Sequence, residues 1–190
     1  MKKTIGALMV AVSAVAFSAN ANATEYNPYV GLDYSYIDGV AKEYRPHYNA
    51  GKVNVGVDYN KYFGTEIFYQ LSDSDKNNSR RYGDKFKSSF QAYGLDVYGY
   101  LPLGCEQTFA LLGTAGIADY RFTYKGNDVR DGHDNRKARD HGVGYRLGLG
   151  AQYSIDNNLS IRAVARYVGL DKVKDYDHMM EYSVGAKYSF

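Results

Sequence analysis

The chain has 190 residues, of which 45% are hydrophobic and 23% charged, with a formal net charge of +2 at pH 7 and a mean hydropathy of −0.48. This composition excludes a helical membrane protein, whose spans need about 20 consecutive apolar residues each, and it shows no basic surplus that would indicate nucleic-acid binding. The 21 tyrosines and only 3 prolines favour β-strands.

The N-terminal segment has the three parts of a secretory signal peptide. Two lysines precede an apolar run over residues 5–17, and the segment ends in the small-residue motif Ala-Asn-Ala at residues 21–23. The apolar run is too short to anchor the chain in a membrane. We therefore predict a signal peptide over residues 1–23, cleaved after Ala23, and a single domain over residues 24–190.

Eight segments of the remaining chain alternate between apolar and polar residues with a period of two, as strands with two different faces do. In chain order they are residues 26–37, 49–59, 64–71, 88–101, 108–124, 142–153, 159–168 and 178–190. Most are close to the roughly 9–11 residues that a tilted membrane strand needs. In the fourth and fifth segments the apolar face is less clear, and its phase is chosen partly from the charges.

The residues opposite the apolar face decide between a soluble barrel with an apolar interior and a membrane barrel with an apolar exterior. This face carries many glycines and serines, which weaken a solvent-exposed strand but suit the crowded lumen of a narrow barrel. It also carries six acidic and six basic residues: Asp33, Asp58, Glu66, Asp96, Asp119 and Glu181, with Lys52, Arg121, Arg146, Arg162, Arg166 and Lys187. We therefore predict a membrane barrel with these twelve residues as a balanced, structural charge network in its interior. The alternative is that they line a selective pore.

The connections between the segments alternate in length. Three are short, over residues 60–63, 102–107 and 154–158, and four are longer, over residues 38–48, 72–87, 125–141 and 169–177. Short periplasmic turns and longer outer loops are typical of membrane barrels. Aromatic residues gather near both strand ends, as at two membrane interfaces: Tyr59, Tyr62, Phe63, Tyr153 and Phe190 at one, and Tyr36, Tyr69, Phe122 and Tyr167 at the other. The pattern predicts an all-β fold, a closed antiparallel up-and-down transmembrane β-barrel of about eight strands.

Three stretches carry a resemblance to a known family. They are Tyr-Asn-Lys-Tyr-Phe-Gly-Thr-Glu at residues 59–66, Gly-Leu-Gly-Ala-Gln-Tyr at 148–153 and Tyr-Ser-Val-Gly-Ala-Lys-Tyr-Ser-Phe at 182–190. The chain resembles the small outer-membrane barrels, namely the OmpA membrane domain, OmpX and the opacity-type proteins, although its aromatic girdles lack tryptophan. The resemblance implies a place in the bacterial outer membrane and a C-terminal strand, with Tyr188 and Phe190, that the barrel-assembly machinery reads.

We expect no catalytic, cofactor-binding or metal-binding residues, and we predict that the protein is not an enzyme. All four histidines fall in outer loops or near strand ends, without a spacing typical of metal ligands: His47, His133, His141 and His178. An Asp-His pair at Asp131 and His133 is the strongest catalytic alternative, and it lies in a glycine-containing loop. Cys105 has no partner for an internal disulfide and is expected to be a free thiol in a turn; the alternative is an intermolecular bridge.

The outer loops are the expected seat of function. Their basic residues would pair with lipopolysaccharide phosphates or other ligands, at Arg80, Arg81, Arg136, Lys137 and Arg139; the alternative is that loop charges only keep the loops soluble. We expect a structural, membrane-integrity or adhesin-like role. The expected partners are outer-membrane lipid, lipopolysaccharide, the barrel-assembly machinery and host or cell-surface ligands, with no nucleic acid. A narrow channel for ions or small solutes is the alternative function, and an outer-membrane enzyme is third.

Overall fold

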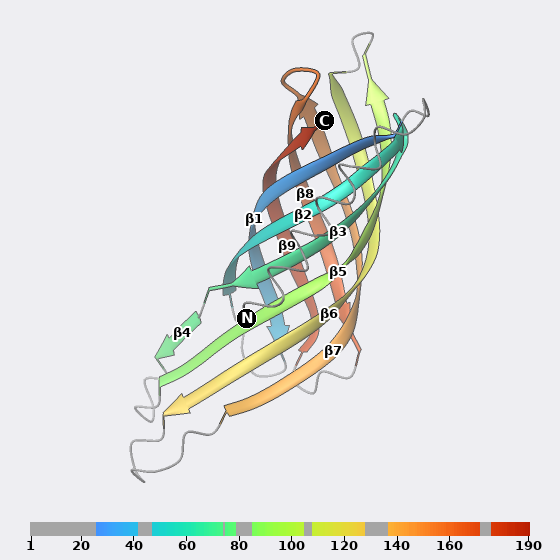
Figure 1. Cartoon of the computed structure of the whole chain (residues 1–190). Helices are drawn as coiled ribbons and strands as arrows, with labels where there is room; N and C mark the ends of the chain where they lie inside the picture. The colour runs from blue at the N-terminus through green and yellow to red at the C-terminus, as the bar shows by residue number, and fades with distance from the viewer. Residues whose placement is uncertain are drawn as a thin grey trace.

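The computed structural model describes residues 26–41, 47–73, 75–78, 85–104, 108–127, 137–171 and 176–190. These residues form nine strands (Figure 1): β1 (Asn27–Ala41), β2 (His47–Asn60), β3 (Phe63–Ser72), β4 (Asp75–Asn78), β5 (Lys85–Leu103), β6 (Phe109–Asn127), β7 (Lys137–Ser154), β8 (Leu159–Leu170) and β9 (Tyr176–Ser189). Across this part of the chain, no helix has the length and apolar character needed to cross a membrane. The predicted signal peptide and Cys105 lie outside the described residues.

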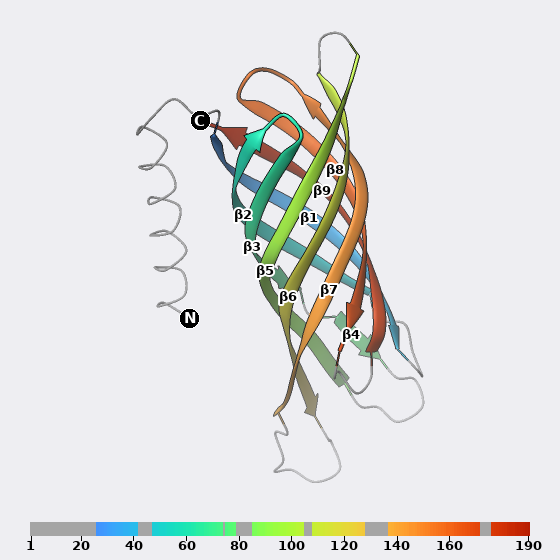
Figure 2. The same cartoon turned by 90° about the vertical axis from the view of Figure 1, so that its right-hand side faces the viewer.

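Eight of the strands close into an antiparallel up-and-down barrel. Their neighbours follow the order β3-β2-β1-β9-β8-β7-β6-β5, and a pairing of β3 with β5 closes the ring. The first and last strands are paired along most of their length, from Tyr29 opposite Ser189 to Val40 opposite His178. The predicted fold class is confirmed, and Figure 2 shows the strands winding around the barrel at a slant.

The ninth strand, β4, was not predicted. It pairs with the outer part of β5, with Asp75 opposite Ser88, on the same edge of β5 that β3 covers further down. β5, β6 and β7 are also longer than the alternation indicates, so part of the expected loops is strand; Figure 1 shows these strands reaching beyond the others. The backbone ladder continues there although the apolar–polar alternation has stopped, because its hydrogen bonds do not depend on side chains.

The two ends of the barrel differ. At one end the strands are joined by the turns at residues 61–62 and 155–158 and by the connection around Gly104, and the chain enters β1 and leaves β9 there (Figure 1). We call this the short-turn end. The opposite end, which we call the outer end, holds the longer connections and the extended parts of β5, β6 and β7.

Period-two alternation gives the wall two distinct faces. Large apolar side chains point outward and stay exposed, among them Leu32, Ile67, Ile117, Leu147, Leu149 and Val184. The inward positions hold buried charges and polar side chains together with small and aromatic residues. The exterior is thus apolar while the charged groups are buried in the interior, which is the reverse of a water-soluble barrel.

Candidate functional site

The structure places ten of the twelve predicted charged residues inside the barrel, five of each sign. Nine are buried: Asp33, Lys52, Glu66, Asp96, Arg146, Arg162, Arg166, Glu181 and Lys187. The tenth, Asp58, has a side chain that is 19% exposed. Seven strands supply them, because one face of every strand turns toward the lumen.

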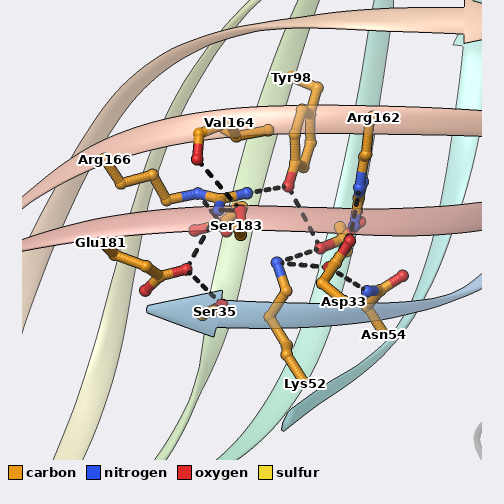
Figure 3. Close-up of polar contacts among 12 residues, drawn as sticks. Asp33, Ser35, Lys52, Asn54, Tyr98, Arg162, Val164, Arg166, Glu181 and Ser183 are labelled. Carbon is orange, nitrogen blue, oxygen red and sulfur yellow. Dashed lines mark hydrogen bonds and ion pairs between the residues drawn. The ribbon is translucent and has the colours of Figure 1, made fainter. Parts of the chain in front are cut away.

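Arg162, on β8, is the centre of a first group of charges (Figure 3). Its Nε and Nη2 atoms donate to the two carboxylate oxygens of Asp33 at 3.1 and 2.8 Å, and its Nη1 donates to Glu66 Oε2 at 2.7 Å. Lys52 Nζ lies 2.9 Å from Asp33 Oδ2 and 3.4 Å from Glu66 Oε1. Two cations thus face two carboxylates from four different strands, so each desolvated charge has two partners.

Glu181, on β9, is the centre of a second group. Arg146 Nη2 donates to both of its carboxylate oxygens, at 3.2 and 3.3 Å, and Arg166 Nη1 donates to Oε1 at 3.1 Å. Asp96 completes this group through longer ion pairs, with Oδ1 3.6 Å from Arg146 Nε and Oδ2 3.9 Å from Arg166 Nε. The second group therefore also balances two cations against two carboxylates.

Neutral side chains join and complete the two groups, and the sequence reasoning did not single them out. The Tyr98 hydroxyl accepts from Arg166 Nη2 at 2.7 Å and donates to Glu66 Oε1 at 3.3 Å, so it bridges the groups (Figure 3). Asn54 Nδ2 donates to Asp33 Oδ2 at 2.8 Å. The signal that could have found both is the period of two, since Tyr98 lies two residues from Asp96 and Asn54 two from Lys52.

On the outer side of the charges the lumen is filled by apolar side chains. The cluster consists of Ile37, Tyr48, Ala50, Phe68, Phe90, Ala92, Ala118, Tyr120, Phe122, Val168 and Met179. The ring of Phe90 contacts Tyr48 and Phe122 at centroid distances of 5.4 and 5.8 Å. Phe68 joins this layer to the charges, because the guanidinium carbon of Arg146 lies 4.1 Å from its ring centroid.

A third layer closes the lumen near the short-turn end. Lys187 forms an ion pair with Asp58, and its Nζ lies over the rings of Tyr29 and Tyr100, 3.9 and 5.2 Å from their centroids. The lumen is thus occupied in sequence by a cation among tyrosines, an ionic network and an aromatic cluster.

Asp119 and Arg121 do not lie in the lumen, so this part of the prediction was wrong. They lie on the outward face of β6, where their side chains are 23% and 59% exposed. The inward phase of β6 belongs to Tyr120 and Phe122, which are 1% and 0% exposed; Phe122 is therefore not at the interface where we expected it. Burying two aromatic rings in the lumen cluster decides the phase, because each ring removes a large apolar area from contact with water.

The histidines, the Asp-His alternative and the predicted basic contacts of the outer loops lie at the outer end or outside the described residues. His47 and His141 are exposed on the strands, with His47 Nδ1 3.3 Å from Asp38 Oδ1, and the ring of His178 stacks on Tyr167. Lys137 and Arg139 are part of strand β7, where they pair with Lys125 and Thr123 of β6. Outside the described residues lie His133, Asp131, Arg80, Arg81 and Arg136. Within the described ranges, no three His, Cys, Asp or Glu side chains are grouped so that they could hold a metal.

The family to which the chain belongs agrees with this architecture. A family model described as the outer membrane protein beta-barrel domain matches residues 7–190. The chain belongs to this outer-membrane β-barrel family. Its members reside in the bacterial outer membrane, so this outer-membrane barrel resides there too. No curated protein matches the chain.

Solved outer-membrane barrels share the fold at low sequence identity. Neisserial surface protein A is 14% identical, with a TM-score of 0.71, 86% of this chain covered and 97% of that chain. A major outer membrane protein from Thermus thermophilus is 13% identical, with a TM-score of 0.60 and coverages of 85% and 99%. Ail, the attachment invasion locus protein of Yersinia pestis, in complex with the heparin analogue sucrose octasulfate, is 12% identical, with a TM-score of 0.57 and coverages of 87% and 97%. At these identities the likeness concerns the fold.

Proposed function

We propose that this protein is a sealed, non-enzymatic barrel that supports the integrity of the outer membrane and meets other surfaces through its outer end. The observation that carries the proposal is the lumen, which three successive layers of side chains occupy. An eight-stranded barrel has an interior just wide enough for its own side chains. The barrel therefore has no open passage, and the residues that contact other molecules lie on its outer surfaces.

The pairing inside the lumen argues against the alternative of a narrow channel. Each charge of the Arg162 group is held by at least two partners at 2.7–3.4 Å. A permeating ion would have to displace these partners in a low-dielectric interior, where an unpaired charge is costly. It would then meet the aromatic cluster, which offers few groups to replace its hydration shell.

Planar-bilayer recording of the folded protein tests the sealed lumen. We expect no steady unitary conductance, while a porin inserted under the same conditions conducts. Steady and reproducible conductance from the purified protein would contradict the proposal and favour the channel.

The outer end is the proposed contact surface. β5, β6 and β7 carry it beyond the other strands (Figure 1), and the predicted contacts Lys137 and Arg139 lie on β7. Ail was solved with a sulfated ligand, so sulfated polysaccharides are one ligand class to test. We expect replacement of Arg80, Arg81, Arg136, Lys137 and Arg139 by glutamine to lower binding of expressing cells to a sulfated polysaccharide surface. Unchanged binding would remove these residues from the proposal.

Export and assembly are part of the same proposal. A signal peptide over residues 1–23 would deliver the chain to the envelope, and the barrel-assembly machinery would then read the last strand. Tyr188 is exposed on the outward face of β9, and Phe190 contacts its ring edge-to-face at a centroid distance of 5.5 Å. The two aromatic residues therefore form one outward-facing feature at the end of the chain.

A further inference from the structure

The outward face of β6 and β7 changes character along its length. At the outer end Arg121 lies opposite His141 in the ladder. Toward the short-turn end the next outward pairs are Asp119 with Val143 and Ile117 with Tyr145. The same strip of wall therefore runs from a charged, polar region through a tyrosine into an apolar region, as the headgroup, interface and acyl layers of a membrane leaflet do.

Arg121 is held in place while remaining accessible. Its Nε donates to Asp119 Oδ2 at 3.1 Å, its Nη2 donates to the Tyr93 hydroxyl at 2.7 Å, and its guanidinium lies 5.1 Å from the Tyr93 ring centroid. The side chain is nevertheless 59% exposed. An outward arginine is costly at the membrane midplane and cheap near the interface, so this position belongs at headgroup level. A planar guanidinium that is already oriented suits a phosphate group.

Below this region the wall contains a shallow apolar groove of about 660 Å³. It is lined by Val97, Gly99, Gly113, Ala115, Leu147 and Leu149, together with neighbours that include residues of β8 and β9. In the ladder Leu149 lies opposite Gly113 and Leu147 opposite Ala115, so leucines form a ridge beside a floor of small residues. Such a furrow can take a hydrocarbon chain lengthwise.

We propose that this strip binds one phosphorylated glycolipid of the outer leaflet, lipopolysaccharide, through its lipid A part. Arg121, with His141 beside it, contacts a lipid A phosphate, and an acyl chain lies in the groove. An amphiphile with an anionic head matches both the exposed guanidinium of Arg121 and the apolar groove. A second copy of the barrel would cover the groove but would bring no phosphate to the guanidinium of Arg121, which stays 59% exposed although it is ion-paired with Asp119.

Native mass spectrometry of the folded full-length barrel, titrated with bisphosphorylated lipid A in detergent, tests the headgroup contact. We expect Arg121→Gln to lower the apparent affinity about tenfold, the size of one charge-assisted hydrogen bond. Asp119→Asn should raise the affinity, because it removes the nearby negative charge and keeps an oxygen acceptor for Arg121. Lys61→Gln is the matched control: Lys61 lies over the Tyr62 ring at the short-turn end, and its loss should change nothing.

A second pair of variants tests the groove. A Cβ at Gly113 would have only Leu149 nearby, at 3.9 Å, and a Cβ at Gly51 on β2 would meet nothing within 4 Å, so a side chain can start at either position without a backbone clash. Gly113→Leu fills the groove and should weaken lipid A binding, whereas Gly51→Leu should not. Heat modifiability on gels shows that both variants are folded.

Several results would overturn the inference. They are unchanged affinity in both Arg121→Gln and Gly113→Leu, an equal loss in Lys61→Gln, or equal binding of lipid A without phosphates. Displacement of lipid A by inorganic phosphate alone, with no effect of Gly113→Leu, would show a free-anion site instead. A shift between dimer and monomer in Gly113→Leu, with lipid occupancy unchanged, would show that a second copy fills the groove.

Discussion

Arg162 shows how a single residue can organise the lumen. Its guanidinium contacts Asp33 and Glu66 through three donors, and the side chain is buried. Such a pair contributes little against an apolar replacement, but losing one partner leaves the others buried and uncompensated. Loss of Arg162 would thus destabilise the barrel mainly because it leaves two buried carboxylates without one of their cations, and only to a small extent through the net energy of its own bonds.

We expect Arg162→Gln to lower the free energy of unfolding by about 3–5 kcal/mol, because it leaves two buried carboxylates with Lys52 as their shared cation. The measurement is urea unfolding of the detergent-folded protein, followed by the loss of the heat-modifiable band. Arg121→Gln, which removes an exposed arginine, should have a much smaller effect. Equal effects of the two variants would contradict an interior network.

Gly185 illustrates the close approach that the lumen demands. A Cβ at this position would overlap the Asp33 carboxylate and lie 2.6 Å from the Leu32 carbonyl oxygen, and a backbone atom cannot move aside cheaply. We expect Gly185→Ala to destabilise the barrel by about 1–3 kcal/mol through overpacking. Gly99→Ala, at an outward position with nothing within 4 Å, is the control and should be tolerated in the same unfolding experiment.

At the scale of elements, alternation predicted the eight barrel strands but not all of their limits or faces. The phase of most strands followed from clear apolar faces. In β6 the predicted phase depends partly on the charges of Asp119 and Arg121, and the packing of Tyr120 and Phe122 in the lumen overrides it. A sequence pattern shows the polarity of the residues along one strand. The contacts between aromatic rings across the lumen depend also on the register of the other strands.

The outer parts of the strands escaped prediction for a different reason. The strands β5, β6 and β7 continue past the residues that alternate between apolar and polar types, and β4 adds to the same sheet. The ten charges in the lumen were predictable, because placing a charge on the lipid side is strongly disfavoured. Their pairing was not, since it needs the three-dimensional arrangement of seven strands.

The turn between β7 and β8 allows a prediction about pH. Asp156 accepts backbone hydrogen bonds from Asn158 and Leu159 at 2.8 and 2.7 Å, and these bonds lower the pKa of its carboxyl group. Because the folded pKa is lowered, the ionised group stabilises the turn above the ordinary aspartate pKa of about 3.9, and this contribution is lost as pH falls through the folded pKa.

An NMR titration of the Asp156 side chain should therefore show a midpoint below about 3.9. Asp156→Asn keeps an oxygen acceptor but no titratable group, so the pH-dependent shifts of the Asn158 and Leu159 amides should disappear in this variant. A midpoint at or above the ordinary value would show that the turn is not held in this way.

At the scale of the whole molecule, the two unlike ends predict one orientation in the membrane, with short turns in the periplasm. Single cysteines in a Cys105→Ser background report it through a membrane-impermeant maleimide applied to intact cells. We expect His47→Cys, whose parent side chain is 51% exposed at the outer end, to be labelled. Lys61→Cys, in the turn between β2 and β3, should react only after the outer membrane is permeabilised. Labelling of Lys61→Cys in intact cells, with His47→Cys labelled only after permeabilisation, would show that the barrel has the opposite orientation.

The pairing of β1 with β9 has a consequence for biogenesis. Asp33 lies on the first strand and Arg162 near the end of the chain, and Asp58 and Lys187 are as far apart, 129 residues in each case. Neither bond can form while the sheet is still an open ribbon, so an unfinished barrel would expose Arg162 and Lys187 to hydrocarbon without these carboxylate partners. Membrane insertion is thereby coupled to closure of the barrel, and a partly formed barrel is disfavoured in the bilayer.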